Sequence, residues 1–581
     1  MTGSVPPEAA GVHSSGDDQF AGPNPHRRLI ILLFCLHTAM LSWCAIRNSF
    51  CWTEAGLLPS GIIDWQFGDF AAFRVNPPLI RMWAALPVLA FDPEVPYYGE
   101  SEDPRHRVEW DLARTMIETN GTVAWTWLIW ARLVCVPLSL LGMYVAGLWA
   151  REQFGNAAQL GTVFLWTFSP WMIGYGCLMS GDAQAASMGV IVLYAFRCWL
   201  RDVSFSRSYI LGVAAGITVL TKLSWLILFG LLPFLWILIR GADWWSARRS
   251  TDLSHKAHWP SVLREVCLAL FSVVICLLVI NLAYGFKGSF RLLGDYHFIS
   301  KALAGGDDWQ MDHFDGNRFR ETWLGGIPVP LPEDLMIGLD LQKWDFDRER
   351  WSYFGGEWQN HGWWFYYLFG LSVKTPIGTL ILFVLAVIGT LTRRRWRGTW
   401  CDTLILLIPV CLILTLASAE TGLNRHTRYV LPVVPLLTVF TGRVFQLLVS
   451  GPLWSRRLIV LCCVWGCFPV CGFSPFPQLF QRTGRWSFER NSFYECQQPG
   501  LGAGSATCER VVRTVSGSAT NLHEILSARR LSGSMGIPLF GNVPNLPRRA
   551  GPNQNVERQF PRAGTSLTMR ASCDSRETCY I

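Results

Sequence analysis

Charged residues are scarce in this chain: they make up 16% of its 581 residues, against about a quarter in soluble domains. Apolar residues make up 51%, and they gather in long blocks near the ~20 residues that cross a bilayer. The shortage of charge excludes an ordinary soluble domain. It predicts an all-α polytopic membrane protein.

The chain also lacks the spacings that hold metals, although it contains 18 cysteines. No CxxC pair or Cys/His metal spacing occurs, and most cysteines lie in apolar runs, where they act as small hydrophobic side chains. A convincing glycine-rich phosphate loop and an internal repeat are missing as well. We expect no metal site and no cofactor, and a requirement for a divalent metal stays open.

Positive charge is the exception, with a net charge of +8. It lies in short clusters between the apolar blocks: Arg27-Arg28, Arg248-Arg249, Arg393 to Arg395 with Arg397, and Arg456-Arg457. This is the pattern of cytoplasmic loops. We therefore expect a cell (inner) membrane protein with its N-terminus in the cytoplasm and its C-terminus outside, and no nucleic-acid partner.

Apolar blocks predict eleven membrane spans, and the arginine clusters all fall on the cytoplasmic side of that arrangement. The spans are 29–47, 127–149, 158–175, 184–199, 208–221, 224–240, 264–285, 366–391, 402–418, 429–449 and 457–474. A disordered cytoplasmic tail (1–28) precedes them, two large outer loops (48–126 and 286–365) interrupt them, and a polar tail (475–581) follows. Because long loops usually carry function, the outer loops are where we expect the site.

Two acidic residues are candidates for proton transfer. Glu54 follows the first span, and Asp182 begins the fourth. A carboxylate at the membrane face can act as general base on a hydroxyl. The alternatives are a solvated loop acid for Glu54 and a first-turn acid favoured by the helix dipole for Asp182.

Several cations are expected at the same outer level, which is unusual because cations favour the cytoplasmic side. They are Lys222, Lys374, Arg425 and Arg428. Together they would neutralise an anionic leaving group, although Lys222 alone is also explained by snorkelling to the interface. Weaker candidates for a sugar or acceptor are Asp69, Glu357 and His361, the last two beside an aromatic belt at 353–376.

An ordered set of segments resembles one family. The segments TEAGLLPSG, RVNPPLIRMWAALP, SGDAQAA, LTKLSW, GGEWQNHGWWFYYLFGLSVKTP and RHTRYVLPVVPLL are similar to those of the bacterial GT-C class of membrane glycosyltransferases. That class includes relatives of the dolichyl-phosphate-mannose–protein mannosyltransferases and the lipid A aminoarabinose transferase. The resemblance covers roughly residues 29–450.

The resemblance implies an enzyme that moves a sugar from a polyprenyl-phosphate donor to a glycan, lipid or protein acceptor at the outer face, with inversion. It implies an Asp-Glu pair in the first outer loop as the base, but this chain has Thr53-Glu54 there, and Leu57 where a histidine is expected. Either Glu54 or Asp182 takes the role, or activity is lost. The rivals are a transporter or flippase of lipid-linked sugar and an inactive remnant.

The tail lacks the strings HSLSYFNELAGGP and NSLDWGQDL with which members of that class continue. Residues 500–506 can be encoded as GGA CTG GGG GCA GGA TCT GC, which reads DWGQDL one base out of frame. Residues 475–485 give HSLSYFNELA in the same way. Our hypothesis is that the chain from about residue 475 is out of frame, and the alternative is a divergent polar tail.

Overall fold

The structure is a computed structural model, and it describes residues 25–471 with internal gaps. The gaps are 50, 98, 100–102, 104, 250–258, 306–315, 348–351, 360–361, 393–398, 420–423 and 425. The predictions for most of the N-terminal tail (1–24) and for the tail beyond 471, including the shifted frame, lie outside the described residues.

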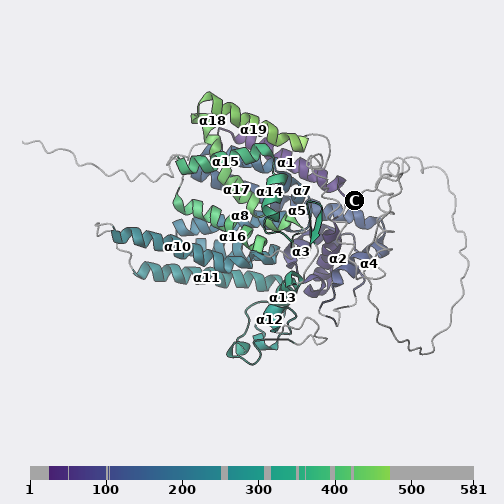
Figure 1. Cartoon of the computed structure of the whole chain (residues 1–581). Coiled ribbons are helices and arrows are strands. Elements are labelled where there is room, and N and C mark those ends of the chain that lie inside the picture. The colour runs from purple at the N-terminus through teal and green to yellow at the C-terminus, as the bar shows by residue number, and fades with distance from the viewer. Residues whose placement is uncertain are drawn as a thin grey trace, which may run out of the picture. The chain divides into compact units, whose positions relative to one another are not determined.

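Helices dominate the described part of the chain (Figure 1). They are α1 (Arg27–Arg47), α2 (Trp52–Phe67), α3 (Pro78–Leu89), α4 (Val108–Asn120), α5 (Val123–Phe154), α6 (Asn156–Thr167), α7 (Pro170–Gly176), α8 (Asp182–Arg201), α9 (Phe205–Thr221), α10 (Leu228–Arg249), α11 (Trp259–Ala283), α12 (Lys301–Ala304), α13 (Glu333–Asp347), α14 (Tyr366–Lys374), α15 (Ile377–Thr392), α16 (Trp400–Ala419), α17 (Val433–Gly442), α18 (Gln446–Ser450) and α19 (Leu453–Cys471). Short 3-10 turns include η2 (Phe70–Phe73), η3 (Leu223–Ile227) and η9 (Thr427–Val430). In this part of the chain two short strands, β1 (Ser352–Phe354) and β2 (Glu357–Gln359), form an antiparallel hairpin.

Within the described residues, seven helices are long and apolar enough to cross a membrane, which confirms the all-α polytopic class. They are Arg27–Arg47, Val123–Phe154, Asp182–Arg201, Leu223–Trp245, Val262–Ala283, Trp400–Ala419 and Val433–Ser450. The predicted span 366–391 is the pair α14 and α15, bent by 112° at its break. The other three predicted spans correspond to α6 with α7, to the shorter α9, and to α19.

The segment between α1 and α5 folds into a compact layer of α2, η2, α3 and α4. A Cβ atom on Gly61 of α2 would lie 2.2 Å from the backbone oxygen of Arg81 in α3, so glycine lets the two backbones touch there. Arg81 forms a buried ion pair with Asp64 at 2.6 Å. The apolar stretch 79–91 is therefore mostly a helix packed within this layer.

The second large loop contains α12, α13 and the hairpin, and ion pairs join it to the first loop. Arg74 pairs with Asp334 at 2.9 Å, and Arg107 pairs with Asp345 at 2.6 Å. Both acids lie on α13. This helix therefore fixes the second loop against the elements that follow α2.

Candidate functional site

Asp182 is the centre of a buried polar cluster. It is the first residue of α8, follows Gly181 with a left-handed φ of 81°, and is only 3% exposed. Its Oδ1 accepts a hydrogen bond from Nζ of Lys222 at 2.5 Å, and its Oδ2 accepts one from Oγ of Ser180 at 3.0 Å. The start of α8 and the end of α9 thus meet at this carboxylate.

Lys222 reaches Asp182 because α9 ends there. Lys222 has extended backbone angles (φ −162°, ψ 133°), and the chain turns directly into η3. The side chain of Lys222 therefore extends from the end of α9 to Asp182. The predicted division of the apolar stretch 208–240 into two helices is correct at this residue.

Arg428 extends the cluster from η9. Its Nη1 lies 4.0 Å from Oδ2 of Asp182 and donates to Oγ1 of Thr53 at 3.3 Å. Thr53, the residue that departs from the family pattern, is thus part of the cluster. The ring of Tyr429 lies under both cations, with Nζ of Lys222 5.4 Å and Cζ of Arg428 5.9 Å from its centroid.

Lys374 joins the cluster through Thr427, the residue before Arg428. Its Nζ donates to Oγ1 of Thr427 at 2.7 Å and lies 5.8 Å from the ring centroid of Trp171. Lys374 is the last residue of α14, directly before the 112° bend to α15. Of the four predicted phosphate ligands, Lys222 and Arg428 therefore lie at Asp182, and Lys374 is linked to them through Thr427.

Glu54 lies next to this cluster but is fully enclosed, with no exposed surface. Arg132 of α5 donates from Nε to Oε1 at 3.0 Å and from Nη2 to Oε2 at 2.6 Å. The backbone N–H of Met179 donates to Oε1 at 3.0 Å, and that of Cys51 donates to Oε2 at 2.9 Å. Glu54 therefore joins α2, α5 and the turn that leads into Asp182.

Asp69 has local partners in the two loops. It caps η2 by accepting from the N–H of Ala71 at 3.1 Å, accepts from the hydroxyl of Tyr97 at 2.6 Å, and pairs with Lys287 at 3.4 Å. Partial burial opposes its ionisation, but these hydrogen bonds and the Lys287 charge outweigh that effect, so the pKa of Asp69 lies below its ordinary value. A contact of Asp69 with a sugar stays a prediction.

Three predicted residues cannot be placed in the site. His361 and Arg425 lie outside the described residues, and of Glu357 only the backbone, in β2, is described. Within the described ranges, no group of three His, Cys, Asp or Glu side chains is arranged to hold a metal ion.

Sequence reasoning missed Arg132, Ser180 and Thr427. Arg132 carried a signal, because a charged residue inside a predicted span is expensive and usually has a buried partner. Ser180 and Thr427 carried none, because a hydroxyl beside a charged residue is common in any loop.

No family model matches the chain, and no curated protein matches it. Among solved structures, the chain is similar to ArnT from Cupriavidus metallidurans in the apo state, with 16% identity and a TM-score of 0.45 over 81% of this chain and 68% of that one. It is also similar to the same protein bound to undecaprenyl phosphate, with 16% identity and a TM-score of 0.46 over 82% of this chain and 69% of that one. ArnT is the lipid A aminoarabinose transferase, a GT-C glycosyltransferase. At these values the likeness supports no transfer of residue roles.

Proposed function

We propose that this chain is an inverting membrane glycosyltransferase that uses a polyprenyl-phosphate-linked sugar donor at the extracytoplasmic face. The observation that carries the proposal is that Lys222 and Arg428 meet at Asp182, with Lys374 bonded to Thr427, the residue before Arg428. Lys222 and Arg428 are 14% and 20% exposed in their side chains, and Lys374 lies beside them. Lysine and arginine side chains gathered in one place suit an anionic ligand such as a phosphate, and the family resemblance makes that ligand a lipid phosphate.

In this proposal Lys222 and Arg428 hold the phosphate of the donor, with Lys374 behind them. When the bond between the sugar and the phosphate oxygen breaks, the electron pair stays on that oxygen. Fixed cations in a site that excludes water stabilise such a developing charge strongly. Nearby aromatic rings, Tyr429 and Trp171, keep the cations oriented.

We choose Asp182 as the general base because its carboxylate oxygens accept fewer hydrogen bonds than those of Glu54. A carboxylate has about four acceptor positions, and each oxygen of Glu54 already accepts two hydrogen bonds. Each oxygen of Asp182 accepts one. Asp182 would take the proton of the acceptor hydroxyl as that oxygen attacks the anomeric carbon opposite the departing phosphate. Glu54 would position the turn that carries Asp182.

The first test is donor-lipid binding by Lys222→Met in the full chain. We expect photolabelling by an undecaprenyl-phosphate analogue to fall about 10- to 150-fold, because a charge-assisted hydrogen bond contributes about 1.5–3 kcal/mol. Lys222→Arg, which keeps the charge, should lose much less. Lys287→Met is the matched control, since Lys287 is half exposed and pairs with Asp69. Equal labelling in all variants would contradict the phosphate site.

The second test separates transfer from transport. Asp182→Asn should keep the photolabel while sugar transfer in membranes falls about 100-fold or more, as expected for loss of a general base. A chain that binds the lipid but yields no glycosylated product in its parent form would instead be the transporter or the remnant.

A further inference from the structure

The second loop exposes a group of large apolar side chains beside the end of α11. We call it the aromatic patch, and it consists of Phe286, Phe290, Leu292, Trp323 and Ile327. Each of these side chains is more than 40% exposed, and Trp323 is 80% exposed. Large exposed apolar groups of this kind mark a surface that contacts a protein or a membrane.

Backbone pairing brings the members of the patch together. The N–H of Phe290 donates to the oxygen of Val329 at 2.9 Å, and the N–H of Leu293 donates to the oxygen of Ile327 at 3.0 Å. The two segments run antiparallel. A Cβ atom on Gly294 would lie 3.2 Å from the backbone oxygen of Gly325, two residues after Trp323, so the segments that carry the patch are packed against each other.

The patch is also firmly joined to a membrane-spanning helix. Phe286 follows the last residue of α11 by three positions, and its N–H donates to the oxygen of Asn281 at 2.8 Å. The side chain of Asn281 donates to the oxygen of Pro330 at 3.0 Å, which attaches the second segment as well. Only 22% of the apolar window of α11 is buried, so its lipid-facing surface leads directly to the patch.

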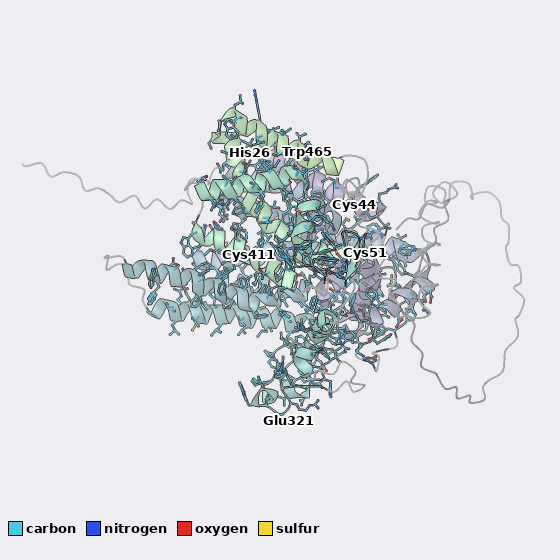
Figure 2. The ribbon with its side chains drawn as sticks, viewed as in Figure 1. His26, Cys44, Cys51, Glu321, Cys411 and Trp465 are labelled. Carbon is cyan, nitrogen blue, oxygen red and sulfur yellow. The ribbon has the colours of Figure 1, made fainter. Side chains whose placement is uncertain are left out.

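The arrangement in the figures fits this continuity. Figure 1 shows the segments around α12 beside α11, on the side away from the other spanning helices. In Figure 2, Glu321, two residues before Trp323, lies at the outer edge of that lobe. In the view of Figure 1, the lobe extends below the right-hand end of α11, on the side away from α10.

Two residues of the aromatic patch have a left-handed backbone conformation, which residues other than glycine rarely adopt. Phe286 has a φ of 59° and Phe290 a φ of 66°. For a bulky residue this left-handed conformation costs about 1–2 kcal/mol relative to glycine. Such strain persists where another interaction offsets it, and both rings are exposed within the chain. Backbone hydrogen bonds of Phe286 to Asn281 and of Phe290 to Val329 hold these conformations, and both rings are presented at the surface.

We propose that the aromatic patch inserts into the interfacial layer of a phospholipid bilayer next to the outer end of α11. Aromatic rings favour that layer because they are apolar and tolerate water at one edge. Arg318 and Arg320, which are exposed and precede Trp323 by five and three residues, suit the lipid phosphates. This membrane anchor sets the height of the second loop, and it is independent of the sugar chemistry.

The test places a photoreactive p-benzoyl-phenylalanine in the full chain at Phe290 or Trp323, one position at a time. Asp111 of α4 is the matched control, because its side chain is 64% exposed and lies in the first loop. Each protein is reconstituted in nanodiscs of phosphatidylcholine that carries an alkyne on the acyl chain. After irradiation, we expect at least about five times more lipid label at Phe290 and Trp323 than at Asp111.

Equal lipid labelling at the three positions, or cross-links to a second copy of the chain in place of lipid, would overturn the proposal. Phe290→Gly provides a second measurement, because it removes a ring and relieves the strained backbone. We expect its melting temperature in detergent to equal or exceed that of the parent, while lipid labelling at Trp323 falls. A clear loss of stability in detergent would show that the ring serves the fold and would contradict the anchor.

Discussion

Thr53 is the residue at which the candidate site departs from the pattern of the resembled family. It stands where the resembled family has aspartate, and its hydroxyl accepts a hydrogen bond from Arg428 at 3.3 Å. A threonine hydroxyl is neutral and cannot act as a carboxylate base. In the part of the chain that the structure describes, Asp182 is the carboxylate shown at Lys222 and Arg428, and the pattern of the resembled family would add a second one at position 53.

Restoring that acid should raise activity. In Thr53→Asp we expect sugar transfer to rise about tenfold, because a second carboxylate beside Arg428 shares the work of orienting and deprotonating the acceptor. The measurement is the initial rate of transfer in membranes at equal protein levels. Thr53→Asn, similar in size but neutral, should show no rise. A lower rate in Thr53→Asp would mean that threonine is suited to this chain's own reaction.

Glu54 should behave as a structural residue. Glu54→Gln leaves Arg132 buried without its counter-charge, which costs about 3–5 kcal/mol, so the melting temperature in detergent should fall clearly. Glu118→Gln is the control, since that carboxylate is half exposed and pairs with Arg114 at the surface. Unchanged melting together with lost transfer would instead assign the base to Glu54.

At the scale of elements, the pair α2 and α3 gives the first loop its rigidity. The close approach at Gly61 and the buried pair of Asp64 with Arg81 hold these helices together. Burial raises the pKa of the Asp64 carboxyl to about 6, against the opposing effect of Arg81. A raised acid pKa means that the folded state binds the proton more tightly than the unfolded chain does.

The raised pKa of Asp64 determines how the stability of the protein changes with pH. The pKa of Asp64 is 3.8 in the unfolded chain and about 6 in the folded protein. Its contribution to stability is therefore fully present below pH 3.8 and is lost as the pH rises through about 6. We expect the difference in melting temperature between pH 5 and pH 7.5 to shrink in Asp64→Asn relative to the parent. Asp69→Asn is the comparison, because the pKa of Asp69 is shifted downwards. An identical pH slope in the parent and Asp64→Asn would contradict this assignment.

The sequence predicted the elements better than their partners. The apolar blocks located the spanning helices, because the length and the periodicity of an apolar run depend directly on which of its residues are buried. Lys222 and Asp182 were singled out because charge at the end of an apolar block is unusual. The enclosure of Glu54 could not be foreseen, since it depends on Arg132, 78 residues away, and on two backbone N–H groups. Exposure and long-range pairing are tertiary properties that no local pattern contains.

For the whole molecule, the open question is the reading frame of the tail. We predict that resequencing the gene and transcript from about codon 445 to the stop will reveal one base gained or lost. The corrected protein would then end in HSLSYFNELA-like and DWGQDL-like strings, and the transferase proposal would gain support. The region encoding 29–440 serves as the control and should read as recorded. Confirmation of the recorded frame would contradict the hypothesis and favour the inactive remnant.

The cluster around Asp182 draws on segments from Thr53 to Arg428, which are 375 residues apart in the chain. During synthesis, Glu54, Asp182 and Lys222 are made well before Arg428. A nascent or truncated chain therefore contains Asp182 and Lys222 but lacks Arg428, the second cation of the proposed phosphate site. Under the proposed function, affinity for the donor lipid would arise only after Arg428 has been made, so shorter chains would not sequester that lipid.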